Sequence, residues 1–499
     1  MGKKADKLKK IAEAAAASKP MMASFDAGSS TRRMARWNLP RNESLNRAIL
    51  REGELIRDRS RDAVRKSPYA TNAKSSFIAN SVGAGIKPSS LHADPAIKAA
   101  IHEAWLQWTD EADADGLTDF YGLQAMAAGS MFEAGEVLVR FRPRRVEDGL
   151  SVPLQLQMLD PEHLPLTLNV MSDTGNPIRA GIEFDQIGRR VAYWLYPQHP
   201  GDIYIGGGGS LSGIKPIPAD QVLHLFNPIR PGQVRGIPHI SSALLKLYEL
   251  DKFDDAALMK AQVAAMFAGF ITKPDPDGTV LNEVGAIDPG VGEATLESGT
   301  MQVLLPGEAV TFNTPPDMPG YKDFMGIQLH AVAAGMGVTY EQLTGDLTGV
   351  NYSSIRAGLV EFRRKIEQFQ HMVLVFQFCR PVFNRWLTDA VLAGRLTLPG
   401  FAKDAQPYRK IKWITPKFDW VDPMKDRLAE KLAVDNGFKS RSDVIEAEGY
   451  DPEENDARIA ADKARETKLG LIFPHPVATE RLTETVPNAD PNAFGQGGR

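Results

Sequence analysis

The sequence has 499 residues, which is too many for one compact core, so we expect three or more structural units. Hydrophobic residues make up 43% and charged residues 24%, a balance that is typical of a folded globular chain and excludes a largely disordered one. The net charge is −4, but residues 1–74 hold 18 Lys and Arg against 8 Asp and Glu, so the remaining residues carry −14. This asymmetry predicts a basic arm that contacts nucleic acid or an acidic partner, although a merely solvated tail has the same composition.

The apolar content also limits where the protein works. The longest strongly apolar run, at 372–379, is far shorter than the ~18 residues that a membrane helix needs, and the first residues lack the apolar core of a secretory signal. The single cysteine, Cys379, excludes an internal disulfide and favours a reducing compartment such as the cytoplasm. Because Cys379 lies in an apolar helical pattern, we interpret it as a core residue rather than a nucleophile.

Along the chain, residues 1–40 show no sustained periodicity and are interpreted as a flexible arm. Helical spacing then predicts a segment at 43–77 that breaks near Pro68, followed by helices at 96–109 and 117–134. Short runs rich in Val, Leu and aromatic residues predict strands at 136–141, 154–159, 191–196 and 221–226. The first half is therefore expected to be a mixed α/β unit.

Two long helical regions dominate the second half. The first, at 240–269, keeps a three-to-four apolar spacing without an internal Pro or Gly, and the second runs from Ser354 to about Leu392 with an expected kink at Pro381. The segment between them, 272–321, is rich in Pro and Gly and carries eight acidic residues against one basic residue. Charged amphipathic helices are expected at 423–434 and 440–448, and the end from Pro474 has a disordered composition.

Signatures of chemistry are scarce. The sequence has no phosphate-binding loop, no zinc-binding helix motif and no nucleophile elbow, so neither a catalytic site, a metal nor a cofactor is predicted. The acidic loop at 111–119 imitates part of a calcium-binding loop, but Gly122 occupies the position of the essential bidentate carboxylate. We therefore interpret it as a connection between helices. Glu133 and Glu136 are close enough in sequence to suggest an acid–base pair, but without a recognisable pocket a solvated surface is the favoured interpretation.

One segment carries a specific resemblance. Residues 321–359 read YKDFMGIQLHAVAAGMGVTYEQLTGDLTGVNYSSIRAGL, and this stretch resembles the lambda-type family of phage portal proteins, in which a glycine-ended helix is followed by YEQL, a polar loop and a YSS-R helix start. The matching residues are Phe324, Ala333, Ala334, Gly335, Gly337, Tyr340, Glu341, Gln342, Leu343, Asn351, Tyr352, Ser353, Ser354 and Arg356. Stretches at 63–85, 181–200 and 224–240 follow the same family in order, so the resemblance covers roughly 40–440. Gly335 and Gly337 would each cost about 1 kcal/mol inside a helix, which predicts that a helix ends or packs very closely there.

The resemblance implies an α+β, multi-domain portal fold that assembles as a ring, dodecameric in this family. The implied units are a basic N-terminal arm (1–40), an α/β wing (41–239), a first stem helix (240–269), a small α/β clip (270–320), a second stem helix (321–338), a tunnel loop (339–354), a long kinked helix that returns to the wing (355–420), a helical crown (421–473) and a disordered tail (474–499).

The same resemblance implies the function: a non-enzymatic ring at one capsid vertex of the virion through which double-stranded DNA is packaged and ejected. The implied partners are the terminase large subunit, the major capsid and scaffold proteins and the head–tail connector. The DNA-facing residues of the tunnel loop would be Thr344, Gly345, Asp346, Leu347, Thr348, Gly349, Val350, Asn351 and Tyr352. The open alternatives are an ordinary helix–helix connection for this loop and, for the whole chain, another virion component such as an adaptor or capsid protein, or a metal-dependent enzyme acting on DNA.

Overall fold

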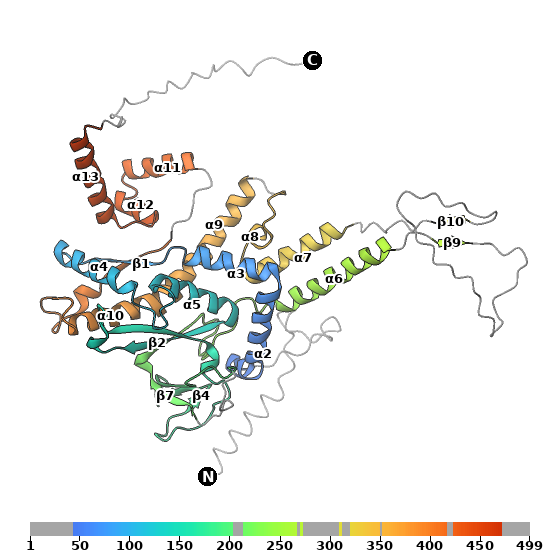
Figure 1. Cartoon of the computed structure of the whole chain (residues 1–499), viewed down its shortest axis with the longest axis horizontal. Coiled ribbons are helices and arrows are strands. Elements are labelled where there is room, and N and C mark those ends of the chain that lie inside the picture. The colour runs from blue at the N-terminus through green and yellow to red at the C-terminus, as the bar shows by residue number, and fades with distance from the viewer. Residues whose placement is uncertain are drawn as a thin grey trace, which may run out of the picture.

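The computed structural model describes residues 43–202, 213–266, 270–272, 309–311, 320–349, 352–416 and 423–471. Figure 1 shows a body of packed helices and small sheets, an arm of two long helices that projects from one side of it, and a separate group of three helices near its other side. The expected basic arm at 1–40 and the tail at 474–499 lie outside the described residues. So does most of the expected clip, of which the structure describes the short antiparallel strands β9 (Phe270–Thr272) and β10 (Ala309–Thr311).

The first helices form as the sequence predicts, and a side chain caps the start of each of the last three. The helices are α2 (Leu45–Lys66), α3 (Pro68–Ser81), α4 (Pro95–Thr109) and α5 (Phe120–Ala134). The expected break lies at Ser67, whose side chain accepts a hydrogen bond from the Ala70 amide while Pro68 begins α3. Asp119 caps α5 in the same way and starts it later than the expected residue 117.

Two antiparallel sheets form the centre of the body. The three-stranded sheet has the order β3-β2-β8, with β2 at Glu136–Pro143, β3 at Leu154–Leu159 and β8 at Val222–Phe226. The four-stranded sheet runs β4 (Ile178–Arg179), β5 (Ile182–Phe184), β6 (Arg190–Leu195) and β7 (Lys215–Pro218). The four predicted strands are confirmed as β2, β3, β6 and β8. The strands β4, β5 and β7 were not predicted, because they are too short or too rich in Pro to show an alternation of apolar and polar residues.

Strand β2 is buried on both faces and therefore organises the core. Val137, Val139 and Phe141 pack against a cluster that contains the buried tryptophans Trp105, Trp108 and Trp386, contributed by α4 and α10. On the opposite face, Leu138 packs against Ile182, Tyr193 and Val222, so the second sheet covers the first half of this face, whereas Arg142 further along it is only partly buried. Burial on both faces explains why β2 reads as a continuous apolar run at its start.

The arm consists of α6 (Leu244–Met266) and α7 (Tyr321–Met336), which lie side by side in Figure 1. The first expected stem helix began at residue 240, but 240–243 forms turns in which the Ser241 amide bonds Pro238 O and the Ala243 amide bonds Ile240 O. Ile240 is fully buried in the body, so its apolar character serves the core rather than the helix. The second stem helix ends two residues before the expected Val338.

A long helical run follows the arm. It comprises the short helix α8 (Tyr340–Thr344), then α9 (Tyr352–Phe369), the π-helix η7 (Gln370–Cys379) and α10 (Arg380–Leu392). Pro381 lies in the first turn of α10, and the expected disturbance takes the form of the π-helix before it. Cys379 is buried in the core as expected, and burial raises the pKa of its thiol.

The chain then returns to the body and forms the separate helical group. Strand β11 (Ile411–Ile414) pairs with β1 (Lys87–Ser90), a contact between distant segments that the sequence did not predict. The helical group contains α11 (Pro423–Asp435), α12 (Arg441–Ala447) and α13 (Pro452–Leu469), which confirms the two expected helices at 423–434 and 440–448. Short 3-10 turns lie at Val146–Asp148, Pro161–His163, Ala219–Gln221 and Gln406–Arg409. Within the described residues, none of the helices has the length and hydropathy required to cross a bilayer.

Candidate functional site

The arm joins the body through a very close helix contact. A Cβ atom added at Gly335 of α7 would lie 3.0 Å from the Cβ of Ala243, and the Ser242 hydroxyl donates to Gly335 O at 2.9 Å. Further along, Leu247 and Leu250 of α6 share a buried cluster with Leu329 of α7. Only a residue without a side chain lets the two backbones approach this closely, so the expected close packing at Gly335 is confirmed.

The end of α7 fixes the direction in which the next segment leaves. Gly337 adopts φ +70°, a left-handed conformation that ends the helix, and this confirms the expected helix end. Thr339 and Gln342 then exchange hydrogen bonds in a capping box that starts α8. Asn72 of α3 donates its side-chain amide to Gln342 O at 2.8 Å and to Leu343 O at 3.1 Å.

These contacts divide the expected tunnel loop in two. Residues 339–344 are anchored, because α8 is held by Asn72 and the Leu343 side chain is buried. Gly345 ends α8 at φ +73°, and 345–349 forms an exposed turn in which Leu347 is 63% exposed. Val350 and Asn351 lie outside the described residues, and Tyr352 begins α9, so 345–349 is the described part of the expected loop 339–354 that lies between the two helices.

The exposed turn offers few charged groups. Its single carboxylate, Asp346, accepts hydrogen bonds from the Thr348 amide at 2.9 Å and the Thr348 hydroxyl at 2.7 Å. These hydrogen bonds from Thr348 lower the pKa of the Asp346 carboxyl. The turn is thus organised by its own side chains, and it presents backbone, hydroxyl and apolar surface rather than a cationic site.

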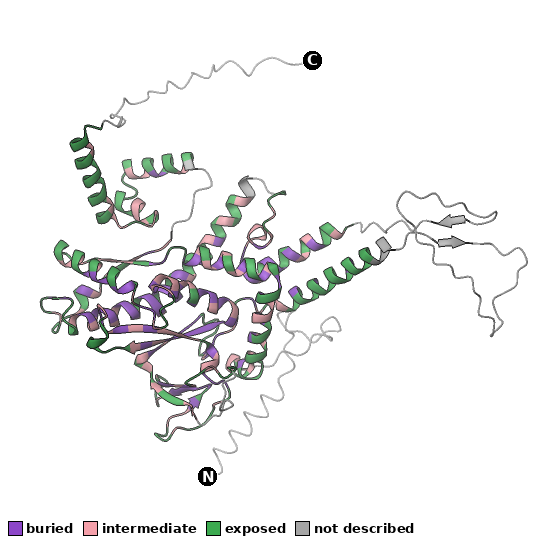
Figure 2. Cartoon of the chain, viewed as in Figure 1, coloured by how far each residue is buried: buried purple, intermediate pink, exposed green. Residues whose placement is uncertain are grey.

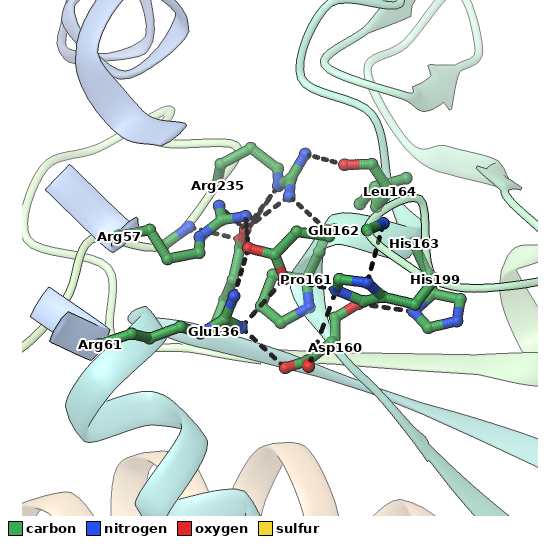
Figure 3. A network of polar contacts seen from close by, with 12 residues as sticks. Arg57, Arg61, Glu136, Asp160, Pro161, Glu162, His163, Leu164, His199 and Arg235 are labelled. Carbon is green, nitrogen blue, oxygen red and sulfur yellow. Dashed lines mark hydrogen bonds and ion pairs between the residues drawn. The ribbon is translucent and has the colours of Figure 1, made fainter. Parts of the chain in front are cut away.

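The base of the arm is fastened to the body by a buried ion network centred on Glu136 (Figure 3). Arg235 donates its Nε to the two Glu136 carboxylate oxygens at 2.8 and 3.0 Å, and Arg57 of α2 donates its Nη2 at 3.0 Å. The Gly236 amide donates to Glu136 Oε2 at 2.6 Å, and His224 Nε2 lies 2.8 Å from the same oxygen. All four partners surround one carboxylate that is fully buried.

This network corrects the interpretation of Glu136 as a solvated residue. Glu133 pairs separately with Lys74, so the two glutamates do not act together. Sequence reasoning missed the network because its members are spread over 57–236. The signal that could have found it was the pair of glycines beside it: a Cβ at Gly135 would collide with the Ile237 backbone, and a Cβ at Gly236 with Gly135 O. The segment that leads into α6 is therefore pressed directly against the start of β2.

The charge state of the network follows from its surroundings. Burial alone would raise the pKa of Glu136, but Arg235, His224 and Arg57 together hold it well below its ordinary value. Burial lowers the pKa of His224 to about 4, against the opposing pull of Glu136. At neutral pH, Glu136 is therefore ionised and His224 is neutral.

These shifts predict that the fold weakens in acid. Between pH 6.5 and about 4, an unfolded chain protonates its imidazole while the folded protein does not. The unfolded state then binds more protons, so the free energy of unfolding falls as the pH drops through this window, by up to roughly 3 kcal/mol for this group. We expect thermal unfolding of His224→Gln to depend less on pH than that of the wild type, whereas His371→Gln, at an exposed site, should match the wild type. Equal pH dependence in all three proteins would contradict this assignment.

An outer layer continues the network towards the surface. Arg61 binds Glu162 through two hydrogen bonds at 2.7 and 2.9 Å and reaches Asp160 at 2.8 Å, and Arg57 also contacts Glu162 at 3.1 Å. Asp160, Glu162 and His199 place one ligand atom each within 4.8 Å of one another, a spacing that suits a metal ion. However, the three arginines of the network already balance its three carboxylates, so no uncompensated negative charge remains to attract a cation.

The acidic loop at 111–119 is a connection between helices, as expected. Asp113 accepts hydrogen bonds from the amides of Asp115, Leu117 and Thr118, and Asp119 is the cap of α5. These carboxylates stabilise the loop and the helix start, so their backbone donors explain the acidic spacing without calcium.

Comparison with known protein families gives a match over most of the chain. A family model described as "Phage portal protein, lambda family" matches residues 30–370. The chain is 29% identical over 476 residues to a probable portal protein of Halomonas phage phiHAP-1, covering 90% of this chain and 88% of the relative. It is 24% identical over 478 residues to portal protein B of Escherichia phage lambda, covering 86% of both chains.

Solved structures show weaker likenesses. The neck of an empty gene transfer agent particle, computed with C6 symmetry, gives a TM-score of 0.44 at 16% identity, covering 81% of this chain and 94% of that chain. The neck of a native particle of the same kind, computed with C12 symmetry, gives a TM-score of 0.42 at 15% identity, covering 82% and 94%.

Proposed function

The chain belongs to the lambda family of phage portal proteins, and from this membership we propose that it assembles into a ring that forms the DNA channel at one vertex of a viral capsid. It is a structural component of the virion rather than an enzyme, in keeping with that family. The ring would be dodecameric by resemblance to the family. Double-stranded DNA would pass through it during packaging and ejection.

The observation that carries this proposal is the surface of the arm. Leu245, Tyr248 and Met259 of α6 and Ile327 of α7 are exposed in the isolated chain, with Leu245 at 73% and Ile327 at 68%. Figure 2 shows that α6 is exposed along most of its length. Large apolar side chains at these positions need a covering partner, and a neighbouring copy of the same arm provides one in a cyclic ring.

The implied partners fit different parts of the molecule. The acidic segment at 272–321, together with β9 and β10, would form the clip that receives the terminase large subunit during packaging and the head–tail connector afterwards. The α/β body would face the major capsid and scaffold proteins, and the basic residues 1–40 would contact DNA or one of these proteins.

Within the ring, the segment 344–352 would face the DNA. This proposal is supported by the anchoring of α8 on α3, which holds the base of the exposed turn, and by the absence of Lys or Arg from the segment. Tight phosphate binding would slow a moving duplex, whereas hydroxyl, amide and apolar groups make weak contacts that do not depend on sequence. The alternative of an ordinary connection between helices predicts no effect of this turn on DNA.

The first test concerns the ring. We expect purified wild-type protein to form rings with a central channel in negative-stain images, and the double variant Leu258→Glu with Met259→Glu to remain mostly monomeric. Both side chains are exposed on α6, so the variant changes the surface without entering the core. The matched control is Leu117→Glu, in the loop before α5, where the side chain is 83% exposed.

The outcomes separate clearly. Burying a carboxylate in an apolar contact costs several kcal/mol per subunit, so ring formation by the α6 variant at wild-type efficiency would exclude the arm from the interface. A stable wild-type monomer of 54.7 kDa under all assembly conditions would contradict the ring itself.

A further inference from the structure

Strand β2 and the residue that follows it carry a row of arginines that the ring and its channel do not explain. Arg140, Arg142 and Arg144 occupy alternate positions, so their side chains project from the same face of the sheet. Among the residues that the structure describes, none of the three forms an ion pair with a carboxylate. Other arginines of the body, such as Arg61 and Arg385, bind an acidic partner. The exposed Arg145 follows directly and adds a fourth positive charge.

Two of these guanidinium groups are held in a fixed orientation by glutamines of β3. Arg142 donates its Nε to Gln157 Oε1 at 2.8 Å, and Arg144 donates its Nε to Gln155 Oε1 at 2.8 Å. The Gln155 amide is itself fixed, because its Nε2 donates to Glu111 O at 2.9 Å and Asp113 O at 3.0 Å. Using Nε for this support leaves the outer Nη groups of both arginines for a ligand.

The position of Arg140 is energetically unfavourable in the isolated chain, and an anionic ligand would reduce this cost. Its Nε is buried without a hydrogen-bond partner, and burial together with the charge of Arg142 lowers the pKa of its guanidinium. Three like charges spaced about 6.6 Å apart along a strand repel one another in the isolated chain. An anion with several oxygens along this line would relieve the repulsion.

We propose that Arg140, Arg142 and Arg144 form a phosphate-binding ladder that holds the backbone of duplex DNA on the outer surface of the body, away from the channel segment. Figure 1 shows that β2 lies in the body and not in the projecting arm. The ladder begins at the edge of β8, because Arg140 pairs with Val222, the first residue of β8, whereas Arg142 and Pro143 pair only with β3.

The surroundings favour DNA over an acidic protein. A protein-docking surface has an apolar centre with a polar rim, whereas protein–DNA interfaces are polar and strongly positive. Beside the three arginines, this face carries Gln155 and Gln157 of β3, while the turn that follows holds the exposed Val146, Glu147 and Asp148 outside the row. Contacts between guanidinium groups and phosphates carry no sequence information, so binding should be independent of sequence.

The test uses the assembled full-length protein and relaxed circular duplex DNA, which cannot thread through a ring and therefore reports binding to the outer surface. We expect Arg140→Gln with Arg142→Gln and Arg144→Gln to weaken binding roughly tenfold or more. The slope of the salt dependence should become shallower by about 0.9 for each arginine–phosphate interaction that the substitutions remove. The matched control, Arg65→Gln with Arg189→Gln and Arg465→Gln, removes the same charge from exposed arginines that already pair with Asp62, Asp185 and Asp462. It should bind within about twofold of the wild type.

A second variant keeps the test decisive if the triple variant folds poorly. The double variant Arg142→Gln with Arg144→Gln changes only the outer two arginines. The double variant Arg142→Lys with Arg144→Lys keeps the positive charges but removes the planar guanidinium groups, which bind phosphate through two hydrogen bonds. The DNA affinity of the Lys variant should therefore lie between those of the wild type and the Gln variant. Wild-type affinity and salt slope in both Gln variants would overturn the proposal. The proposal would also be overturned if the rings bound polyglutamate through the ladder but did not bind circular DNA, because an acidic protein would then be the ligand. Ring images of the same samples separate the two proposals, since loss of the ladder leaves ring assembly intact.

Discussion

Replacing Glu136 by Gln is expected to lower the free energy of unfolding by about 3–5 kcal/mol, the largest stability effect that we predict for a single substitution outside the apolar core. The change keeps the shape of the side chain but removes the negative charge that Arg57 and Arg235 share in a fully buried position. Two guanidinium groups would then remain in the interior with one fewer carboxylate between them. Denaturation followed by tryptophan fluorescence measures this effect, because Trp105, Trp108 and Trp386 lie in the adjacent core.

Glu162→Gln provides the matched control in the outer layer. Its carboxylate also binds two arginines, Arg57 and Arg61, but it is about 20% exposed, so solvent compensates part of the loss and a clearly smaller effect is expected. Because Arg235 and Gly236 lead directly into the segment before α6, we also expect Glu136→Gln to form fewer rings than Glu162→Gln. A loss below 1 kcal/mol for Glu136→Gln would show that the network is not needed to hold the arm on the body.

Shortening the exposed turn at 345–349 is expected to spare ring formation and to reduce the number of DNA-filled heads. The anchored part of the segment ends at Thr344, and the buried Leu343 and its hydrogen bonds with Asn72 remain intact. Even one weak contact of about 1 kcal/mol per subunit, repeated around a ring, predicts a loss of retained genomes on the order of tenfold or more. Packaging assays and the DNA content of purified heads measure this loss.

A replacement of the same five residues by a Gly/Ser segment of equal length tests whether the length of the turn or the identity of its side chains matters for holding DNA. The contacts that we propose are weak and independent of sequence, so the replaced turn should retain most of its activity while the shortened turn does not. Full heads with a normal genome length from shortened rings would show that the turn has no role in holding DNA. Failure of the shortened chain to form rings would identify the segment as an ordinary structural connection.

The sequence alone determined the elements whose causes are local. Apolar spacing located α4 and α5, Pro68 located the break before α3, and the runs of Val and Leu located β2 and β3. The cost of glycine in a helix correctly marked Gly335 as a close contact and Gly337 as a helix end. The ordered resemblance to the portal family was also sufficient to assign the chain, because several motifs in the right order are far more specific than any one.

The tertiary structure decided what depends on residues far apart in the chain. Glu136 looked like a solvated carboxylate because the arginines and histidine that surround it come from α2, β8 and the segment before α6. Strands β1 and β11 are each four residues long and gain their stability by pairing across more than 300 positions, so neither shows a pattern of its own. Ile240 fits the apolar spacing of the helix that follows, but its side chain is buried in the core of the body. The orientation of Arg142 and Arg144 depends on glutamines of the neighbouring strand β3. A sequence pattern reports which face of an element is apolar, whereas the partner of a buried charge is set by how the elements pack.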